Sequence, residues 1–190
     1  MKTMVMDAKK MKHPRILEEE EIAHMLNAAK KAGSRNYMLL KCLYCLGLKA
    51  GEARRLMVKD IDFEQNVVNI GGRRIMIPGA FTFELKQFVK GREGLVFTGR
   101  GTDGGLSGRH IRRLVKEAAR KGNVRNCGEI KPHTLRVSYA THLRRDGIPV
   151  KAIQSLLGHA RRETTYMYTH GLKQINGAES EDEKPNEEGV

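Results

Sequence analysis

One stretch of forty residues constrains this chain more than any other: residues 131–170, KPHTLRVSYATHLRRDGIPVKAIQSLLGHARRETTYMYTH. It contains His133, Arg136, His159 and Tyr168. If a helix begins one residue after His133, the histidine lies at its entry and Arg136 in its first turn, where unpaired backbone N–H groups attract an anion. A guanidinium, two imidazoles and a phenol around such a site predict cleavage of a phosphodiester. Each residue alone also fits an ordinary helix surface, and only their joint spacing favours a site.

Length and composition restrict the class of protein. A chain of 190 residues has the length of one domain with a proper core. No apolar run approaches the roughly 18 residues that a membrane span needs, so we expect no membrane association. The basic N-terminus, MKTMVMDAKKMKHP, lacks the apolar segment of a secretory signal. Three cysteines fit a reducing compartment, and we expect a cytoplasmic protein.

Two of the cysteines, Cys42 and Cys45, form a CxxC pattern. This pattern is typical of zinc and redox sites, but here it lies within the apolar run YMLLKCLYCLGL with no second ligand pair nearby. We therefore interpret both cysteines as core residues. The sequence predicts neither a metal nor a cofactor.

The net charge indicates the kind of partner. The chain carries +13, but its last fourteen residues hold six acids and one lysine. Removing their net charge of −5 leaves +18 on residues 1–176. So large a surplus on a folded body predicts a polyanionic partner, most simply nucleic acid. Acidic membranes are the competing partner, but no basic amphipathic helix with a strong aromatic face is evident.

The apolar pattern predicts a mainly α-helical single domain with a small antiparallel β-sheet (α+β). Residues 14–176 form this domain, between a basic arm at 1–13 and an acidic tail at 177–190 that has too few apolar residues to fold. Strands are expected around a Gly71-Gly72 turn, at 60–63, 67–70 and 74–78. Helices are expected at 18–33, 34–46, 52–57, 81–89, 108–121, 134–145, 149–158 and 164–170.

Two elements carry exposed cations that we predict to contact DNA. Ser107 is expected to cap a helix that ends near Lys121, and its basic face would lie along a phosphate backbone through Arg109, Arg112, Arg113 and Lys116. The hairpin would present Arg73 and Arg74 near its tip. For each cation of the helix taken alone, a solvated charged face is an equally good interpretation.

With these residues identified, the chain resembles the catalytic domain of the tyrosine recombinase (phage integrase) family from about Pro14 to Gly171. The most specific motifs match in order and spacing: HTLR at 133–136, ATHL at 140–143, LLGH at 156–159 and TTYMYTH at 164–170. The segment LGLKAGE at 46–52 is similar to the box around the family's first catalytic arginine. The resemblance implies the fold of that catalytic domain, with its β-hairpin at 67–78.

The resemblance also implies a prokaryotic or viral recombinase or integrase that cuts and rejoins double-stranded DNA through a 3′-phosphotyrosine, without metal or ATP. Tyr168 would be the nucleophile, Arg136 would hold the non-bridging oxygens, and His133 and His159 would assist by proton transfer and hydrogen bonding. We expect the cationic pocket to activate the phenol, whose ordinary pKa is about 10. Tyr166 is the rival phenol, about 200° round the helix; the nine-residue spacing from His159 favours Tyr168.

Two catalytic positions depart from the family pattern. Lys49 stands where the family has its first arginine, and a lysine lacks the planar fork that grips two phosphate oxygens. The family's hairpin lysine, its general acid, is replaced by arginines, whose pKa above about 12 makes them poor proton donors. Lys49 would then take over the acid role, or the chain would be a catalytically impaired DNA-binding relative that occupies or regulates recombination sites.

The ends of the chain raise a further set of expectations. The family usually adds an N-terminal DNA-binding domain, whereas only the basic arm precedes this domain, so we expect an excised fragment or a minimal protein. Strand exchange in the family is carried out by a tetramer whose C-terminal segments are swapped. Only Leu172 and Ile175 can dock beyond Gly171, which predicts a weak link and a monomer without DNA. The acidic tail could mimic DNA on the basic face, but a solvated tail is favoured.

Overall fold

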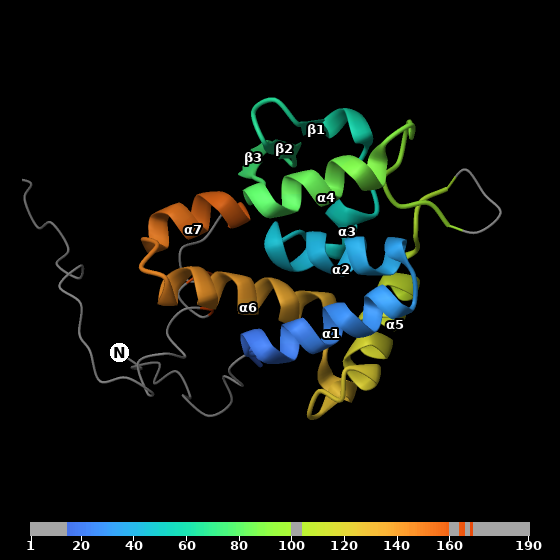
Figure 1. The fold of residues 1–190 in the computed structure, drawn as a ribbon. Coiled ribbons are helices and arrows are strands. Elements are labelled where there is room, and N and C mark those ends of the chain that lie inside the picture. Colours follow the sequence, from blue (N-terminus) through green and yellow to red (C-terminus); the bar gives the residue numbers. More distant parts are fainter. Residues whose placement is uncertain (1–14, 100–103, 160–163, 166–167, 169–190) are drawn as a thin grey trace, which may run out of the picture.

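The computed structural model describes residues 15–99, 104–159, 164, 165 and 168 (Figure 1). The strands are β1 (Ile61–Asp62), β2 (Val67–Ile70) and β3 (Arg73–Met76). The helices are α1 (Glu19–Lys31), α2 (Ser34–Cys45), α3 (Ala50–Ala53), α4 (Gly79–Val89), α5 (Gly108–Lys121), α6 (Pro132–Arg145) and α7 (Val150–Leu157), with short 3-10 turns η1 (Val58–Asp60) and η2 (Cys127–Glu129). The predicted α+β class is confirmed.

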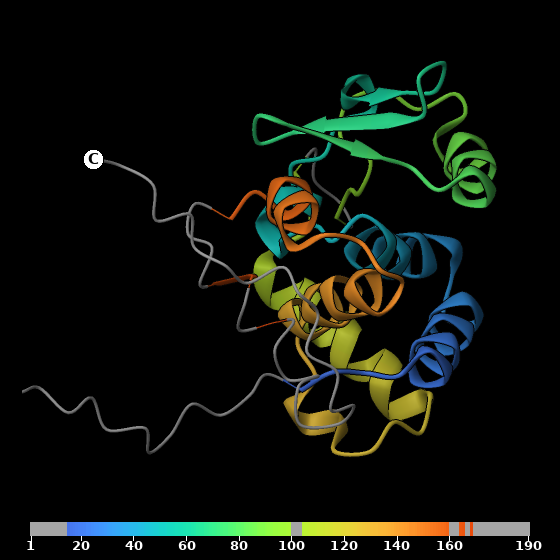
Figure 2. The same cartoon turned by 90° about the vertical axis from the view of Figure 1, so that its left-hand side faces the viewer.

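The three strands form one antiparallel sheet in the order β1-β2-β3. Gly71 and Gly72 turn the chain between β2 and β3 with φ values of 56° and 73°, which glycine adopts without steric cost. The views in Figure 1 and Figure 2 place this sheet and α4 on one side of a helical body, with α7 between β3 and α6. The sheet therefore meets the helical body at α7, and the predicted site residue His159 follows the end of that helix.

The helices form where charge and apolar spacing agree. Acids occupy the first turn of α1 and two lysines its last turn, which suits the helix dipole. The Ser107 hydroxyl accepts a hydrogen bond from the backbone N–H of His110 at 3.1 Å, so the predicted cap of α5 is confirmed. Helix α2 packs against α1 and α6 in the main core, and Cys42 is fully buried there. The interpretation of Cys42 as a core residue is confirmed.

A second, smaller apolar cluster joins α6, α7 and the last part of the chain. It contains Val137, Ala140, Ile153, Leu157 and Tyr168. The ring of the predicted nucleophile is thus part of a core, and its side chain is positioned by packing as well as by hydrogen bonds.

Several boundaries differ from the sequence prediction. Helix α6 begins at Pro132, two residues earlier than expected, because proline suits a first helical turn and the Thr134 hydroxyl accepts the backbone N–H of Lys131 at 3.1 Å. Arg136 therefore lies in the second turn, and the prediction of a first-turn arginine is wrong. Helix α3 covers Ala50–Ala53 instead of 52–57, since Glu52 folds back onto the backbone of Lys49.

Other expectations concern parts of the chain that the structure does not describe. The basic arm, the acidic tail, Tyr166 and the segment beyond Tyr168 lie outside the described residues. Of the helix expected at 164–170, the described residues Thr164, Thr165 and Tyr168 are helical. In the part of the chain that is described, no helix has the length and apolar character needed to cross a membrane.

Gly47 follows α2 with a φ of 56°, and a Cβ there would lie 2.8 Å from Tyr139 Cδ1 and 2.9 Å from Leu157 Cδ2. We expect Gly47→Ala to lower the free energy of unfolding by about 2–4 kcal/mol, since left-handed strain and overpacking add. Gly72→Ala is the matched control, because Gly72 also has a positive φ but no atom within 4 Å of its Cβ position. Urea unfolding measures both, and equal losses would contradict the packing argument.

Candidate active site

The guanidinium of Arg136 is buried at the junction of four helices. Its side chain is 2% exposed, and it donates hydrogen bonds to the backbone carbonyls of Gly47, just after α2, and of Leu157, at the end of α7. Its Nη1 atom lies 3.9 Å from Oε2 of Glu52 on α3. The predicted phosphate-holding arginine therefore also connects the elements that surround the site.

Tyr168 lies against both predicted histidines. Its hydroxyl is 3.2 Å from Nε2 of His133. Its ring meets the rings of His133 and His159 edge-on, with centroids 5.4 and 5.0 Å away. The Tyr168 carbonyl accepts a hydrogen bond from the hydroxyl of Thr141 on α6 at 2.8 Å. Side chain and backbone are thus both fixed, and the hydroxyl is directed toward an imidazole.

His159 follows the end of α7 and shares the electrostatic environment of the other predicted residues. Gly158 ends the helix in the left-handed conformation, and His159 Nδ1 then lies 2.9 Å from the Thr165 hydroxyl. Burial lowers the pKa of His159 to about 4, helped by the positive charges of Arg136, Lys49 and other cations nearby. The His159 imidazole is therefore neutral at pH 7.

The two other titrating groups at this site are also shifted by burial. Burial and the charge of Arg136 lower the pKa of His133, so its imidazole is neutral too. The pKa of Tyr168 is raised, because burial outweighs the opposing effect of Arg136. Arg136 thus acts on the phenol in the expected direction, but its charge alone does not bring the pKa of Tyr168 below the ordinary value. A neutral His133 beside the hydroxyl is instead a proton acceptor in place.

Glu52 is a member of this cluster that sequence reasoning missed. Its Oε1 atom pairs with Nη2 of Arg73 at 3.0 Å, its Oε2 atom lies near Arg136, and Oε2 also accepts the backbone N–H of Lys49 at 2.8 Å. One carboxylate thus fixes two guanidinium groups and the start of α3. The signal was its spacing of three residues from Lys49, which places both on one short helical turn.

The two hairpin arginines have different environments. Arg73 is directed toward α7, where it donates a hydrogen bond to the Leu157 carbonyl, and its side chain is 9% exposed. Arg74 is exposed and donates to the side chain of Gln65. Neighbouring residues of a strand point to opposite faces, so only Arg73 joins the site. Lys49 is exposed at the N-cap of α3.

The cations predicted on the basic helix are exposed, on the face of α5 opposite its buried residues: Arg109, Arg112, Arg113 and Lys116. They form a surface separate from the hydrogen-bonded cluster around Tyr168. Because exposed cations on one helix face can follow a phosphate backbone, this geometry is compatible with the predicted role.

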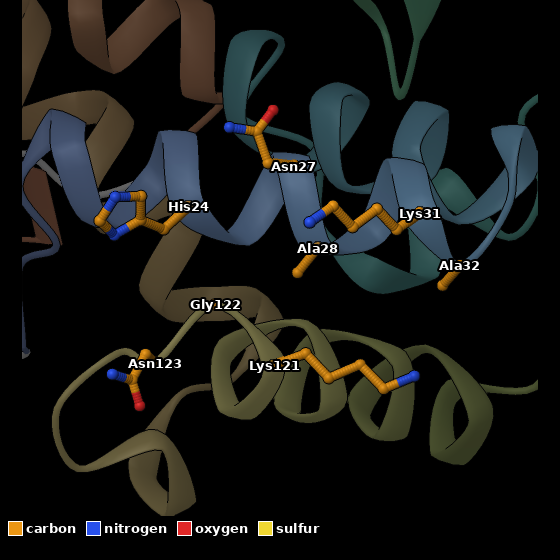
Figure 3. A pocket seen from close by; sticks show the side chains of 8 residues that line it. All are labelled: His24, Asn27, Ala28, Lys31, Ala32, Lys121, Gly122 and Asn123. Carbon is orange, nitrogen blue, oxygen red and sulfur yellow. The ribbon is translucent and has the colours of Figure 1, made fainter.

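A pocket of about 460 Å³ lies elsewhere, where α1 and the end of α5 approach each other (Figure 3). His24 and Lys31 line it from α1 and Lys121 and Asn123 from the end of α5, and none of them is a predicted site residue. Among the residues that the structure describes, no cluster of three metal-ligating side chains occurs.

The fold is mainly helical with one small antiparallel sheet, and a tyrosine, two histidines and a buried arginine lie together in it. This is the fold of a tyrosine recombinase catalytic domain. The sequence model described as "Phage integrase family" matches residues 15–174, and the chain belongs to this family.

Curated relatives and solved structures agree with this assignment. The chain is 33% identical to tyrosine recombinase XerA of Pyrococcus furiosus, over 82% of this chain and 57% of the relative. It is 30% identical to tyrosine recombinase XerD of Neisseria meningitidis, over 83% and 58%. The crystal structure of XerA recombinase superposes with a TM-score of 0.74 at 25% identity, covering 83% of this chain and 60% of the other. XerH recombinase bound to its difH substrate gives 0.71 at 25% identity, covering 83% and 51%.

The chain therefore spans less than two thirds of the length of these relatives. The family model's match, residues 15–174, contains all the residues of the cluster around Tyr168.

The depressed pKa of His159 predicts a pH dependence of stability. His159 binds a proton near pH 6.5 in the unfolded chain, but only near pH 4 in the folded chain. The stability of the folded state therefore falls as pH decreases from 6.5 to 4. His159→Gln should have a shallower decline over this window and the same dependence above pH 7. Urea unfolding at several pH values measures this, with His24→Gln on the exposed face of α1 as control. Parallel curves for wild type and His159→Gln would refute it.

Proposed function

We propose that this chain is the catalytic domain of a site-specific DNA recombinase or integrase that cuts and rejoins strands through Tyr168. The observation that carries this proposal is the position of the Tyr168 hydroxyl, 3.2 Å from His133 Nε2, with His159 against the same ring and the Arg136 guanidinium nearby. This combination supplies a nucleophile, a proton acceptor and a permanent cation for a phosphate.

The proposed step exchanges one phosphate ester for another. The Tyr168 oxygen attacks the phosphorus, the bond from phosphorus to the 5′-oxygen breaks, and a 3′-phosphotyrosine and a 5′-hydroxyl result. The phenolic proton passes to Nε2 of neutral His133, while Arg136 and His159 hold the non-bridging oxygens. The 5′-oxygen must gain a proton, and Lys49 is the ammonium group at the site that can supply it. When a new 5′-hydroxyl attacks the phosphotyrosine, this step runs in reverse and the strands are rejoined, so no nucleoside triphosphate is consumed.

The partners follow from this step and from charge. The substrate is double-stranded DNA, held by the exposed cations of α5 and by the hairpin, with Arg74 among the outer contacts. Exchange between two duplexes requires several active sites, and we propose a tetramer on DNA and a monomer in its absence. The basic arm at 1–13 and the acidic tail at 177–190 flank the catalytic domain. We propose the cytoplasm as its compartment, because DNA and a reducing environment meet there.

Replacing the nucleophile is the direct test. Duplexes selected from a random pool by binding to the chain, and then nicked near the bound region, trap a covalent intermediate because the short cleaved fragment diffuses away. We expect an SDS-resistant protein–DNA adduct with the wild type, none with Tyr168→Phe, and an unchanged amount with Tyr166→Phe. Gel electrophoresis of labelled DNA measures it.

The outcomes separate the two candidate functions. An adduct that persists in Tyr168→Phe would contradict the proposed nucleophile. If the wild type gives no adduct and Lys49→Arg does, the chain is the catalytically impaired relative that binds recombination sites. If neither gives one while the selected duplex is bound, only the DNA-binding function stands.

The basic surface of α5 has its own prediction. Each phosphate contact contributes about 0.9 to the slope of log affinity against log salt concentration. The double variant Arg112→Ala/Lys116→Ala should therefore lower this slope by about 1–2. Fluorescence anisotropy of labelled DNA, at salt concentrations from about 50 to about 200 mM, measures this slope. The control is Lys86→Ala/Lys90→Ala, in α4 and at the residue that follows it, which removes the same charge. An equal drop there would mean that net charge alone is responsible.

A further inference from the structure

We propose that Arg73 provides the second guanidinium group of the phosphate site, a role that is distinct from an outer DNA contact of the hairpin. This inference rests on the proposed function and assigns a further substrate-binding residue to it. It also explains how a phosphate could be gripped at two sides although position 49 carries a lysine.

The argument begins with a shared acceptor. Arg73 on β3 and Arg136 on α6 are far apart in the sequence, yet both donate hydrogen bonds to the carbonyl oxygen of Leu157. Both also pair with the carboxylate of Glu52, at 3.0 and 3.9 Å. Two planar guanidinium groups therefore donate to one oxygen atom, and this is the geometry in which two arginines bind a single phosphate group.

The charge at this point is incompletely balanced. The one carboxylate of Glu52 serves two guanidinium groups, and Arg73 is one of the cations that lower the pKa of His159. The Nε and Nη2 atoms of Arg73 are buried and find no hydrogen-bond acceptor, although Nη2 is ion-paired with Glu52. A buried donor without an acceptor is costly, and an anion that enters the site removes that cost.

The approach of Arg73 to α7 depends on a glycine. A Cβ on Gly158 would overlap the Cδ and Nη1 atoms of Arg73, so the arginine crosses the helix end at the one residue without a side chain. This crossing places the guanidinium next to His159, the following residue. The Leu157 carbonyl accepts from the Nη1 atom of Arg73, so the buried Nε and Nη2 donors are the ones that remain for the non-bridging oxygens of a phosphate.

The competing explanation is purely structural. An arginine that donates to the last carbonyl of a helix stabilises that helix end without any ligand. The two explanations differ in one measurable property: only a phosphate contact makes the effect of Arg73 depend on the charge of one particular phosphate.

A methylphosphonate scan measures that property. In the selected duplex, each phosphate near the bound region is replaced in turn by a neutral methylphosphonate, and binding is measured with Tyr168→Phe protein so that no cleavage interferes. We expect one position at which neutralisation weakens binding by about tenfold, as for a lost charge-assisted contact. Adding Arg73→Gln, which keeps a donor for the Leu157 carbonyl, should reduce this penalty to about twofold. Adding Arg74→Ala, the matched control from the same hairpin, should leave the penalty unchanged.

Each outcome of the methylphosphonate scan decides whether Arg73 contacts a phosphate. If the penalty at every position is the same with and without Arg73, Arg73 only supports α7 and the inference is wrong, even if Arg73→Gln is less stable to urea. If the Arg73-dependent phosphate is the one that becomes linked to Tyr168 in the adduct assay, the inference and the proposed function both hold. If an Arg73-dependent phosphate exists but no adduct forms, Arg73 binds phosphate and the cleavage function fails separately.

Discussion

The structure depends on one buried cation, the guanidinium of Arg136. It joins the carbonyl after α2 to the carbonyl at the end of α7, and it does so from α6 with the carboxylate of Glu52 close by. Removing one partner of such a buried pair commonly costs about 3–5 kcal/mol, because the remaining charge is left without compensation. The elements around the site are therefore held together by the same group that would bind the substrate, and loss of folding and loss of function cannot be separated at this residue.

The distribution of charge explains how a buried phenol can serve as a nucleophile. Both imidazoles are neutral at pH 7, so the positive charge of the site resides in its guanidinium and ammonium groups. Burial also raises the pKa of Tyr168, so its hydroxyl is protonated at pH 7. In the proposed reaction, the phenolic proton passes to His133 while a phosphate is held beside the Tyr168 hydroxyl.

The parts of the fold that follow from local chemistry were predictable from the sequence. Charge at the ends of α1, the Ser107 cap and the Gly71-Gly72 turn depend on near neighbours in the chain. Residues in the motifs around Arg136 and Tyr168 could be selected by their spacing. The missed features of the site depend on contacts between distant segments. The role of Glu52 requires α3 to meet β3 and α6, and the raised pKa of Tyr168 requires the second apolar cluster to close over its ring.

The difference between Arg73 and Arg74 illustrates the same limit and suggests how the site tolerates a lysine at position 49. In the sequence the two arginines are equivalent neighbours, but strand alternation directs one toward α7 and the other toward solvent. Glu52 remains the common anchor, since its carboxylate holds the backbone of Lys49 and the guanidinium groups of both Arg73 and Arg136. A second guanidinium group can therefore come from the hairpin instead of from α3, because the Glu52 carboxylate can pair with an arginine from either element.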